Sequence, residues 1–581
     1  MPSQFQKIER KWLPKNIALS TFDDILPFFQ ELHKDEWKKE EDLLKWLDKY
    51  SELDAFLNEE LAWRYINYTR YTDNEDYSSA YSFYIKEIQP HLIKEGHELT
   101  KKLVNHPLFD CLNDDPMINF KLKSKLSLDL FNEKNIPLEV KQNNLSQEYA
   151  SIIGGLSILH DGNELTMQQA STLLLKPDRS ERKVIYEKIN DERLKVRSEI
   201  ESIFHDLIHL RNEVALNCKF LNYRDFKHKS LARFDYSVEE VFSFHNAVEK
   251  VALPYLDLLY SDRKEKLSIK ELYPYDLQVN IYDNVPLKPF ESSDELIDKS
   301  IECFNKIDPF FGTTLSVMKE KGFLDLNSRK GKAPGGYNYP LDESGIPFIF
   351  MNASGSMRDL TTMVHEGGHA VHSLLTRNLS SNWLKHCPSE VAELASMSME
   401  LISMDGWDSF FPNERDLLRA KIDQLEGVLD VLPWIATVDC FQHWIYTHPK
   451  ASKSERVEEW MKILERFSSS EIQTPPAYES YIKNYWQKQL HIFEVPFYYI
   501  EYGIAQLGAI AIWKNYMKNP KTTLDQYKAA LELGYTRSIP AIYSTAGIKF
   551  SFDEDYVSDL LSFVWDELQL LRTKFYTLDQ N

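Results

Sequence analysis

Apolar residues recur at helical spacing through most of the chain. From Trp37 to about Tyr71, charged and apolar positions alternate with the period of a helix, and helical patterning resumes near Arg179 and continues to about residue 260. The segment Thr21–Asp24 has the pattern of a capping box, with an apolar run behind it. The pattern therefore predicts a mainly α protein.

Two stretches follow a different pattern. Near residues 155–167, LSILHDGNELTM alternates apolar and polar residues about Asp161-Gly162, which is typical of a β-hairpin. Between 321 and 352, GKAPGGYNYP and LDESG precede IPFIFMN. The glycines, prolines and β-rich run predict a loop and a small hairpin, with Ile346–Asn352 as an edge strand. Such an edge could pair with an extended peptide.

Length and charge limit the possibilities further. A chain of 581 residues is long enough for several domains, and we place one boundary near residue 195, giving domains 1–195 and 196–581. The 68 basic and 89 acidic residues leave a net charge of −21, which repels phosphate. We therefore expect no nucleic-acid partner. Whether the chain is a monomer or a homodimer stays open.

Cysteine content and hydropathy indicate the cellular compartment in which the protein is expected. The five cysteines are scattered without short spacings, which is typical of free thiols in a reducing environment. No apolar run approaches the length of a membrane span. We expect a cytoplasmic protein without a membrane partner.

One segment carries metal-binding chemistry. Ser356–Asp359 is a second capping box, and it opens a helix that we expect to reach about Arg377. The motif HEGGH occupies His365–His369 within that helix. Histidines four residues apart share a helix face, at a spacing that lets two imidazoles bind one Zn²⁺. Glu366 follows the first histidine, where it can serve as general base toward a metal-bound water.

The two glycines of the motif are a second signal. Gly367 and Gly368 lie in a helix interior, where each costs about 1 kcal/mol relative to alanine. We therefore expect a second backbone to pass close to this helix.

A third ligand is available in the next predicted helix. The segment PSEVAELASMSMELIS offers Glu390, Glu393 and Glu400. Two histidines and one glutamate leave a fourth zinc position open, as in catalytic sites. The residues themselves leave the choice open, with a slight preference for Glu393 because alanine and serine around it suggest tight packing.

An aromatic segment follows near residue 491. Pro496 fits the first turn of a helix, on which Tyr498, Tyr499 and Tyr502 fall within a roughly 100° arc. Such a stripe is usually core packing. Beside a zinc site, however, tyrosine hydroxyls and the imidazole of His491 could donate hydrogen bonds to an oxyanion.

The motifs GKAPGGY, PFIFMN, HEGGHAVH, SEVAELASMSME and TAGIKFSFDEDYV, in this order, resemble the oligoendopeptidase F and thimet oligopeptidase family of zinc metallopeptidases. The resemblance runs from about residue 200 to the C-terminus, and 137–190 looks like the helical segment of the oligoendopeptidase F branch. It implies a mainly α, two-lobed clam shell with a deep channel and a small β hairpin beside the zinc-binding helix, with the catalytic domain at 196–581.

The resemblance also implies a function and a set of site residues. The function is a zinc-dependent endopeptidase that cleaves internal bonds of short peptides with metal-activated water. The metal site is one Zn²⁺ per chain on His365, His369 and Glu393, since the family's third ligand lies 28 or 29 residues after the first histidine. The catalytic residues would be Glu366 as general base and, for the oxyanion, His491, Tyr498 and Tyr502. Substrate would contact Gly335, Gly336, Tyr337, Phe350, Asn352 and Tyr499.

Several alternatives remain. His205 and His209 have the same spacing with Asp206 between them and are the best rival metal site, although a surface or inter-helix role is expected. His372 is expected in packing or near the metal ligands, and His386-Cys387 is a weak metal signal. A metallocarboxypeptidase and a non-catalytic peptide-binding protein are the alternative functions.

Overall fold

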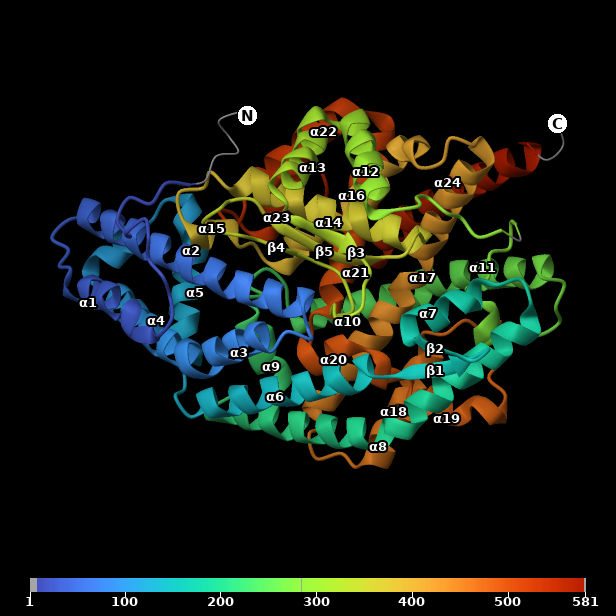
Figure 1. The fold of residues 1–581 in the computed structure, drawn as a ribbon, viewed down its shortest axis with the longest axis horizontal. Helices are drawn as coiled ribbons and strands as arrows, with labels where there is room; N and C mark the ends of the chain where they lie inside the picture. The colour runs from blue at the N-terminus through green and yellow to red at the C-terminus, as the bar shows by residue number, and fades with distance from the viewer. Residues whose placement is uncertain (1–7, 284, 579–581) are drawn as a thin grey trace. The chain divides into compact units, whose positions relative to one another are not determined.

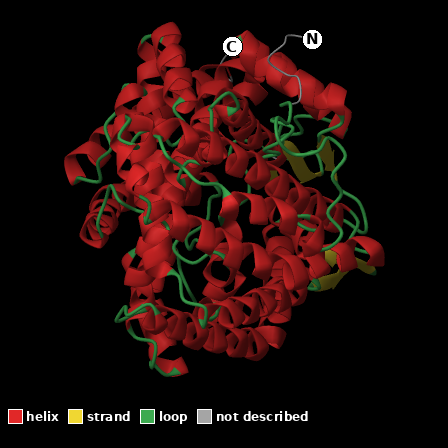
Figure 2. Cartoon of the chain, turned by 90° about the vertical axis from the view of Figure 1, so that its left-hand side faces the viewer, coloured by secondary structure: helices red, strands yellow, loops and turns green. Residues whose placement is uncertain are grey.

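Helices make up most of the protein. The computed structural model describes residues 8–283 and 285–578, and its strands are confined to two small patches (Figure 2). The predicted mainly α fold class is confirmed. Within the described ranges, no helix combines the length and the apolar character that crossing a membrane requires.

The chain forms two compact units, each assembled from three segments. Unit 1 takes residues up to 131, 288–417 and 508–550, and unit 2 takes 132–287, 418–507 and the residues from 551 onward. Residue 195 lies inside helix α8 (Arg179–Asn217) of unit 2. The predicted domains 1–195 and 196–581 stay a prediction, as does the channel of the clam shell.

Unit 1 begins with a helical layer. The capping box at Thr21 is present, and it opens a 3₁₀ turn ahead of the first α-helix. The indole of Trp46 is buried among these helices and donates to the carbonyl of Leu32 at 2.9 Å. The helices are α1 (Leu26–Lys34), α2 (Glu40–Arg70), α3 (Glu75–Phe83), α4 (Gln89–Val104) and α5 (Asp115–Leu130) (Figure 1).

A three-stranded sheet follows in unit 1, with the order β3-β5-β4. Its strands are β3 (Leu324–Asn327), β4 (Tyr337–Tyr339) and β5 (Phe348–Ala353). The expectation that Ile346–Asn352 is an edge strand is wrong, because β5 pairs in parallel with β3 and antiparallel with β4. Its backbone groups are engaged on both sides, and the edge strands of this sheet are β3 and β4.

The remaining helices of unit 1 come from its second and third segments. They are α12 (Ser293–Ile307), α13 (Pro309–Lys321), α14 (Met357–Thr376), α15 (Asn382–Lys385), α16 (Ser389–Ile402), α22 (Pro520–Glu532) and α23 (Ile539–Thr545). The predicted capping box at Ser356 is confirmed, with its hydroxyl accepting from the backbone N–H of Asp359, and α14 ends one residue before Arg377.

The contact between α14 and α16 has almost no spare room. A Cβ atom on Gly368 would lie 2.6 Å from the Cα of Ser396 and 2.8 Å from the carbonyl oxygen of Ala395. The expected close approach of a second backbone is confirmed at this glycine. At Gly367 the neighbour is instead the ring of Phe304, which would lie 2.7 Å from a Cβ atom at that position.

Unit 2 contains the long helix α8 and a hairpin. Strands β1 (Ser157–His160) and β2 (Asn163–Thr166) pair antiparallel, and Asp161 and Gly162 both have positive φ, as a two-residue hairpin turn requires. The predicted hairpin is confirmed. The helices are α6 (Asn135–Gly154), α7 (Met167–Thr172), α9 (Tyr223–Ser230), α10 (Val238–Ala247), α11 (Leu253–Lys266), α18 (Lys453–Arg466), α19 (Glu479–Lys483), α20 (Leu490–Glu494) and α24 (Glu554–Leu578). Helices α17 (Glu414–Thr447) and α21 (Tyr499–Lys518) each have residues in both units.

Replacing Gly368 by alanine is expected to lower the free energy of unfolding by about 1–3 kcal/mol, because the added methyl overlaps the backbone of α16. Gly427→Ala is the matched control: Gly427 is an exposed helical glycine, and a Cβ atom there would have no atom within 4 Å. That control substitution should raise the free energy of unfolding by up to about 1 kcal/mol. Urea denaturation measures both, and equal stability of Gly368→Ala and the native chain would contradict the packing argument.

Candidate functional site

Three side chains of unit 1 converge on one point. One ligand atom from each of His365, His369 and Glu393 lies within 4.8 Å of the others. The carboxylate of Glu393 is 3.3 Å from Nε2 of His365 and 3.7 Å from Nε2 of His369. Tetrahedral zinc with ligands at about 2.0–2.2 Å separates its ligand atoms by roughly 3.3 Å. The two nitrogens and the carboxylate oxygen therefore fit a zinc ion.

A fourth side chain orients the first histidine. Glu400 lies two turns after Glu393 on α16, and its carboxylate is 2.7 Å from Nδ1 of His365. A hydrogen bond at Nδ1 leaves the Nε2 lone pair available as a ligand, which is the usual arrangement behind metal-binding histidines. Glu400 was one of three candidates for the third ligand, and the structure places it beside Nδ1 of His365 instead.

The electrostatics of the cluster favour a positive charge. Burial lowers the pKa of His365, but hydrogen bonds with Glu393 and Glu400 outweigh it, so the pKa lies well above its ordinary value. Burial lowers the pKa of His369 to about 4. The carboxylates thus stabilise a cation beside Nε2 of His365, and His369 keeps a free lone pair. Both properties suit a metal ion.

Glu366 lies next to this cluster, within the interior of α14. Its side chain is buried, and burial raises the pKa of its carboxyl to about 7. Its backbone carbonyl accepts a hydrogen bond from Nδ2 of Asn338 in β4 at 3.3 Å. The edge strand β4 is therefore joined directly to Glu366, the residue after His365.

The predicted aromatic residues form a second cluster, in unit 2. The ring of His491 is centred 6.2 Å from Tyr498, 4.9 Å from Tyr499 and 5.8 Å from Tyr502. Tyr502 also contacts both other tyrosines, with centroids at 5.3 and 5.5 Å. Nδ1 of His491 is 2.7 Å from the side-chain amide of Gln489. All four predicted residues are thus brought together.

The backbone ahead of these tyrosines departs from the prediction. Pro496 was expected in the first turn of a helix, but α21 begins at Tyr499. The reason is Phe497, which has a φ of +65° and so interrupts the helical path. Its N–H donates to Gln442 at 2.8 Å, and its carbonyl accepts from Arg233 at 2.5 Å.

Arg233 also anchors the start of the tyrosine helix. Its guanidinium donates to the carboxylate of Glu501 at 2.7 Å, and both side chains are buried. Glu501 immediately precedes Tyr502. Neither Arg233 nor Gln442 has a local sequence signal, since both are distant along the chain from the residues they hold.

The predicted substrate residues of the sheet have mostly structural contacts. Phe350 is fully buried, and its ring stacks on Tyr337 with centroids 4.8 Å apart. The amide of Asn352 donates to the carbonyls of Ala333 and Gly335 at 2.7 and 3.0 Å. Phe350 therefore has no exposed side chain to offer a ligand, and Asn352 shapes the loop before β4.

The two glycines of that loop differ. Gly335 has a φ of +100°, which favours glycine, and a Cβ there would meet no atom within 4 Å. Gly336 packs on the sheet itself, since a Cβ would lie 3.3 Å from the carbonyl oxygen of Phe350. The hydroxyl of Tyr337 is 2.7 Å from Thr69 of α2. A substrate role for these residues stays a prediction.

The remaining histidine candidates fall outside the metal cluster. His372 is buried, burial lowers its pKa to about 3, and it lies 3.9 Å from the sulfur of Cys387. His386 pairs with Asp342 at 2.9 Å. In the part of the chain that the structure describes, no second group of three metal-ligating side chains converges as His365, His369 and Glu393 do.

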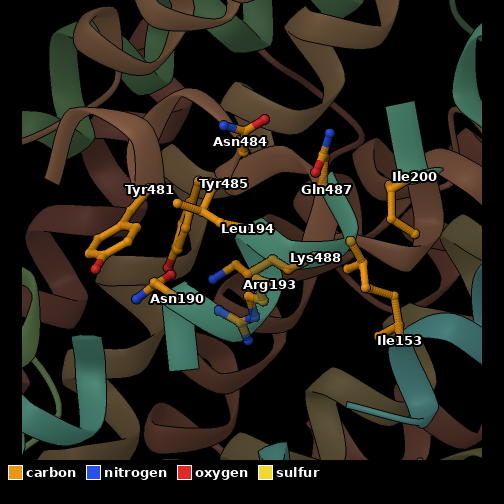
Figure 3. Close-up of a pocket in the computed structure, with 11 residues that line it drawn as sticks. Ile153, Asn190, Arg193, Leu194, Ile200, Tyr481, Asn484, Tyr485, Gln487 and Lys488 are labelled. Atoms are coloured by element: carbon orange, nitrogen blue, oxygen red, sulfur yellow. The ribbon is translucent and has the colours of Figure 1, made fainter. Parts of the chain in front are cut away.

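A small cavity lies in unit 2 between α8 and residues 481–488 (Figure 3). It measures about 20 Å³, and Arg193, Tyr485 and Lys488 are among its lining residues. That volume suits about one water molecule. The cavity is too small for a peptide and does not compete with the metal cluster as a substrate site.

Comparison with known families gives an independent view of these motifs. The model described as "Peptidase family M3" matches residues 172–560, and that of the "Peptidase M3 N-terminal domain" matches residues 17–131. Together the two matches include the metal cluster, the aromatic cluster and the N-terminal helices.

Among curated proteins, the oligoendopeptidase F homolog of Borreliella burgdorferi is 27% identical over 305 residues, 50% of this chain and 49% of that protein. The oligopeptidase PepF of Bacillus subtilis is 24% identical over 318 residues, 54% of this chain and 47% of that protein. The chain thus spans about half the length of the curated relatives it matches.

Solved structures show the same fold. A structure of PZ peptidase A with an inhibitor has a TM-score of 0.90 at 24% identity, covering 96% of this chain and 98% of that one. The oligoendopeptidase-F of Enterococcus faecium has a TM-score of 0.65 at 15% identity, with 96% and 98% covered. At these identities the likeness concerns the fold alone.

Replacing Glu400 by glutamine is expected to weaken zinc binding about 10- to 100-fold, because His365 loses the charged acceptor at Nδ1. Glu393→Gln should weaken it more, since a ligand is lost. Glu390→Gln is the matched control on α16, because Glu390 is buried but lies outside the cluster. Competition with a chelator measures all three, and equal affinities of Glu400→Gln and Glu390→Gln would contradict the assignment.

Proposed function

The chain belongs to peptidase family M3, as its motifs predicted, and on this premise we propose that it is a zinc-dependent endopeptidase that hydrolyses internal bonds of short peptides. The observation that carries the proposal is the convergence of His365, His369 and Glu393 with the buried Glu366 between the two histidines. A binding protein has no need of a buried carboxyl at that position.

The proposed cofactor is one Zn²⁺ per chain. His365, His369 and Glu393 would hold it, and Glu400 would keep His365 in the correct tautomer. When bound, the ion supplies Lewis-acid polarisation of the scissile carbonyl and lowers the pKa of a coordinated water.

Glu366 is the proposed general base and acid. Its carboxylate takes a proton from the attacking water as the new C–O bond forms, and returns a proton to the amide nitrogen as the C–N bond breaks. A pKa raised to about 7 by burial suits a group that both accepts and donates a proton near neutral pH.

The aromatic cluster of unit 2 is proposed to act on the oxyanion. Tyrosine hydroxyls and a histidine N–H can donate to a developing negative charge, and His491, Tyr498 and Tyr502 already lie together. Arg233 and Gln442 support this role because they hold Phe497, the residue before Tyr498, in its unusual backbone conformation. Tyr499 is proposed to contact substrate.

The substrate backbone is proposed to pair with the sheet edge at β4. Tyr337 lies in that strand, Gly335 and Gly336 precede it, and its Asn338 is bonded to Glu366. Backbone pairing at an edge strand would suit peptides of varied sequence. A cytoplasmic location and the absence of nucleic-acid and membrane partners stay predictions from charge and composition.

Glu366→Gln is expected to reduce turnover about 10³-fold or more, because the amide can neither accept nor return the proton. The substrate is a fluorogenic peptide acetylated at one end and amidated at the other, so that internal cleavage alone gives signal. Zinc content, measured by metal analysis, should stay at one per chain. Near-normal cleavage by Glu366→Gln would refute the mechanism, and cleavage confined to peptides with a free carboxyl terminus would favour a carboxypeptidase.

Tyr498→Phe and Tyr502→Phe are each expected to lower kcat about 10²- to 10³-fold with little change in KM, since a donor to the oxyanion is lost. Tyr499→Phe is the matched control in the same cluster and should alter KM more than kcat. Steady-state kinetics with zinc content held at one per chain test this. Unchanged kcat in both donor variants would show that the cluster is packing.

A further inference from the structure

A second histidine pair, away from the metal cluster, has metal-binding geometry. His205 and His209 lie one turn apart on α8 of unit 2, which is drawn in green along the lower margin of Figure 1. Their Nε2 atoms are 3.1 Å apart, and both residues are exposed. Of the expected surface or inter-helix role, the exposure agrees with the surface position, and the two Nε2 atoms face each other.

The arrangement repeats that of the pair in the metal cluster. The rings of His205 and His209 are centred 4.3 Å apart with planes at 85°, while those of His365 and His369 are centred 4.9 Å apart with planes at 84°. Both pairs occupy positions i and i+4 of a helix, so the backbone already fixes both imidazoles on one face. Binding of a metal ion would therefore require little further ordering of the two side chains.

The charges around the pair are mixed. Burial, His209 and Arg456 lower the pKa of His205, while Asp206 opposes them. Arg456 itself is bonded to the carboxylate of Glu201, which offsets part of its charge.

We propose that His205 and His209 form a second, solvent-facing site for a divalent transition-metal ion bound through both Nε2 atoms. Within residues 8–283 and 285–578, no third protein ligand converges on this pair, so water would complete the coordination. Two imidazole ligands, with the other coordination positions filled by water, favour Cu²⁺ and Ni²⁺ over Zn²⁺. The site should bind more weakly than the three-ligand cluster of unit 1.

The test uses the zinc-loaded protein, so that the cluster of unit 1 is occupied. One equivalent of Cu²⁺ is added and followed by electron paramagnetic resonance, with zinc content measured before and after. The expected result is a copper signal with hyperfine splitting from two imidazole nitrogens and no loss of zinc. His205→Ala and His209→Ala should each lower the copper affinity about tenfold or more, since chelation by two linked ligands is lost.

Two controls make the test decisive. His448→Ala removes another exposed histidine of unit 2 and should leave the copper signal unchanged. His369→Ala, which removes a proposed ligand of the unit 1 cluster, should also keep the two-nitrogen signal. A failure of the proposed catalytic function can therefore be distinguished from a failure of the copper site. Peptide cleavage by His205→Ala should equal that of the native chain. Equal copper affinity of His209→Ala and the native chain, or displacement of zinc with no further site, would overturn the proposal.

Discussion

The metal cluster depends on how closely two helices approach each other. His365 and His369 lie on α14, whereas Glu393 lies on α16, so the distance between the helix axes sets the ligand distances. Gly368 makes the approach possible, because any side chain there would overlap Ser396. Two further hydrogen bonds hold the backbone of α16: Tyr527 donates to the carbonyl of Ala395 at 2.7 Å, and Tyr543 to that of Glu390 at 3.1 Å. These backbone contacts fix the position of Glu393 relative to the two histidines.

The same packing has an electrostatic cost, because it buries carboxyl groups together. Glu366 and Glu393 are both buried, and the negative charge of Glu393 adds to the burial that raises the pKa of Glu366, so that ionising Glu366 is costly. A positive charge between the imidazoles relieves that cost, whether it is a proton on His365 or a metal ion. Glu366 is not among the three side chains that converge as metal ligands, and its raised pKa follows from burial first. One small volume therefore holds a carboxylate suited to binding and another suited to proton transfer.

Local signals predicted much of this arrangement, and long-range contacts supplied the rest. The capping box at Ser356 and the spacing within HEGGH act over a few residues, so the sequence shows them directly. The position of β5 in the middle of the sheet depends on its parallel partner β3, more than 20 residues earlier, which no local pattern reveals. Phe497 is a similar case, because its positive φ is stabilised by Arg233 from the loop between α9 and α10 and by Gln442 from α17. Glu400 could be found as a carboxylate near the site, but its role depends on which nitrogen of His365 it meets.

The two histidine pairs show what helical spacing alone determines. Spacing i, i+4 gives both pairs nearly the same ring geometry, with planes at 84° and 85°. It does not determine burial or the presence of a third ligand, which come from the neighbouring elements. At His365 the neighbour is α16, with two carboxylates on facing turns, and the pair becomes part of a buried cluster. At His205 the pair faces solvent, so any metal it binds keeps its water. A catalytic centre therefore requires the second helix, and the close packing at Gly368 is what brings that helix within reach.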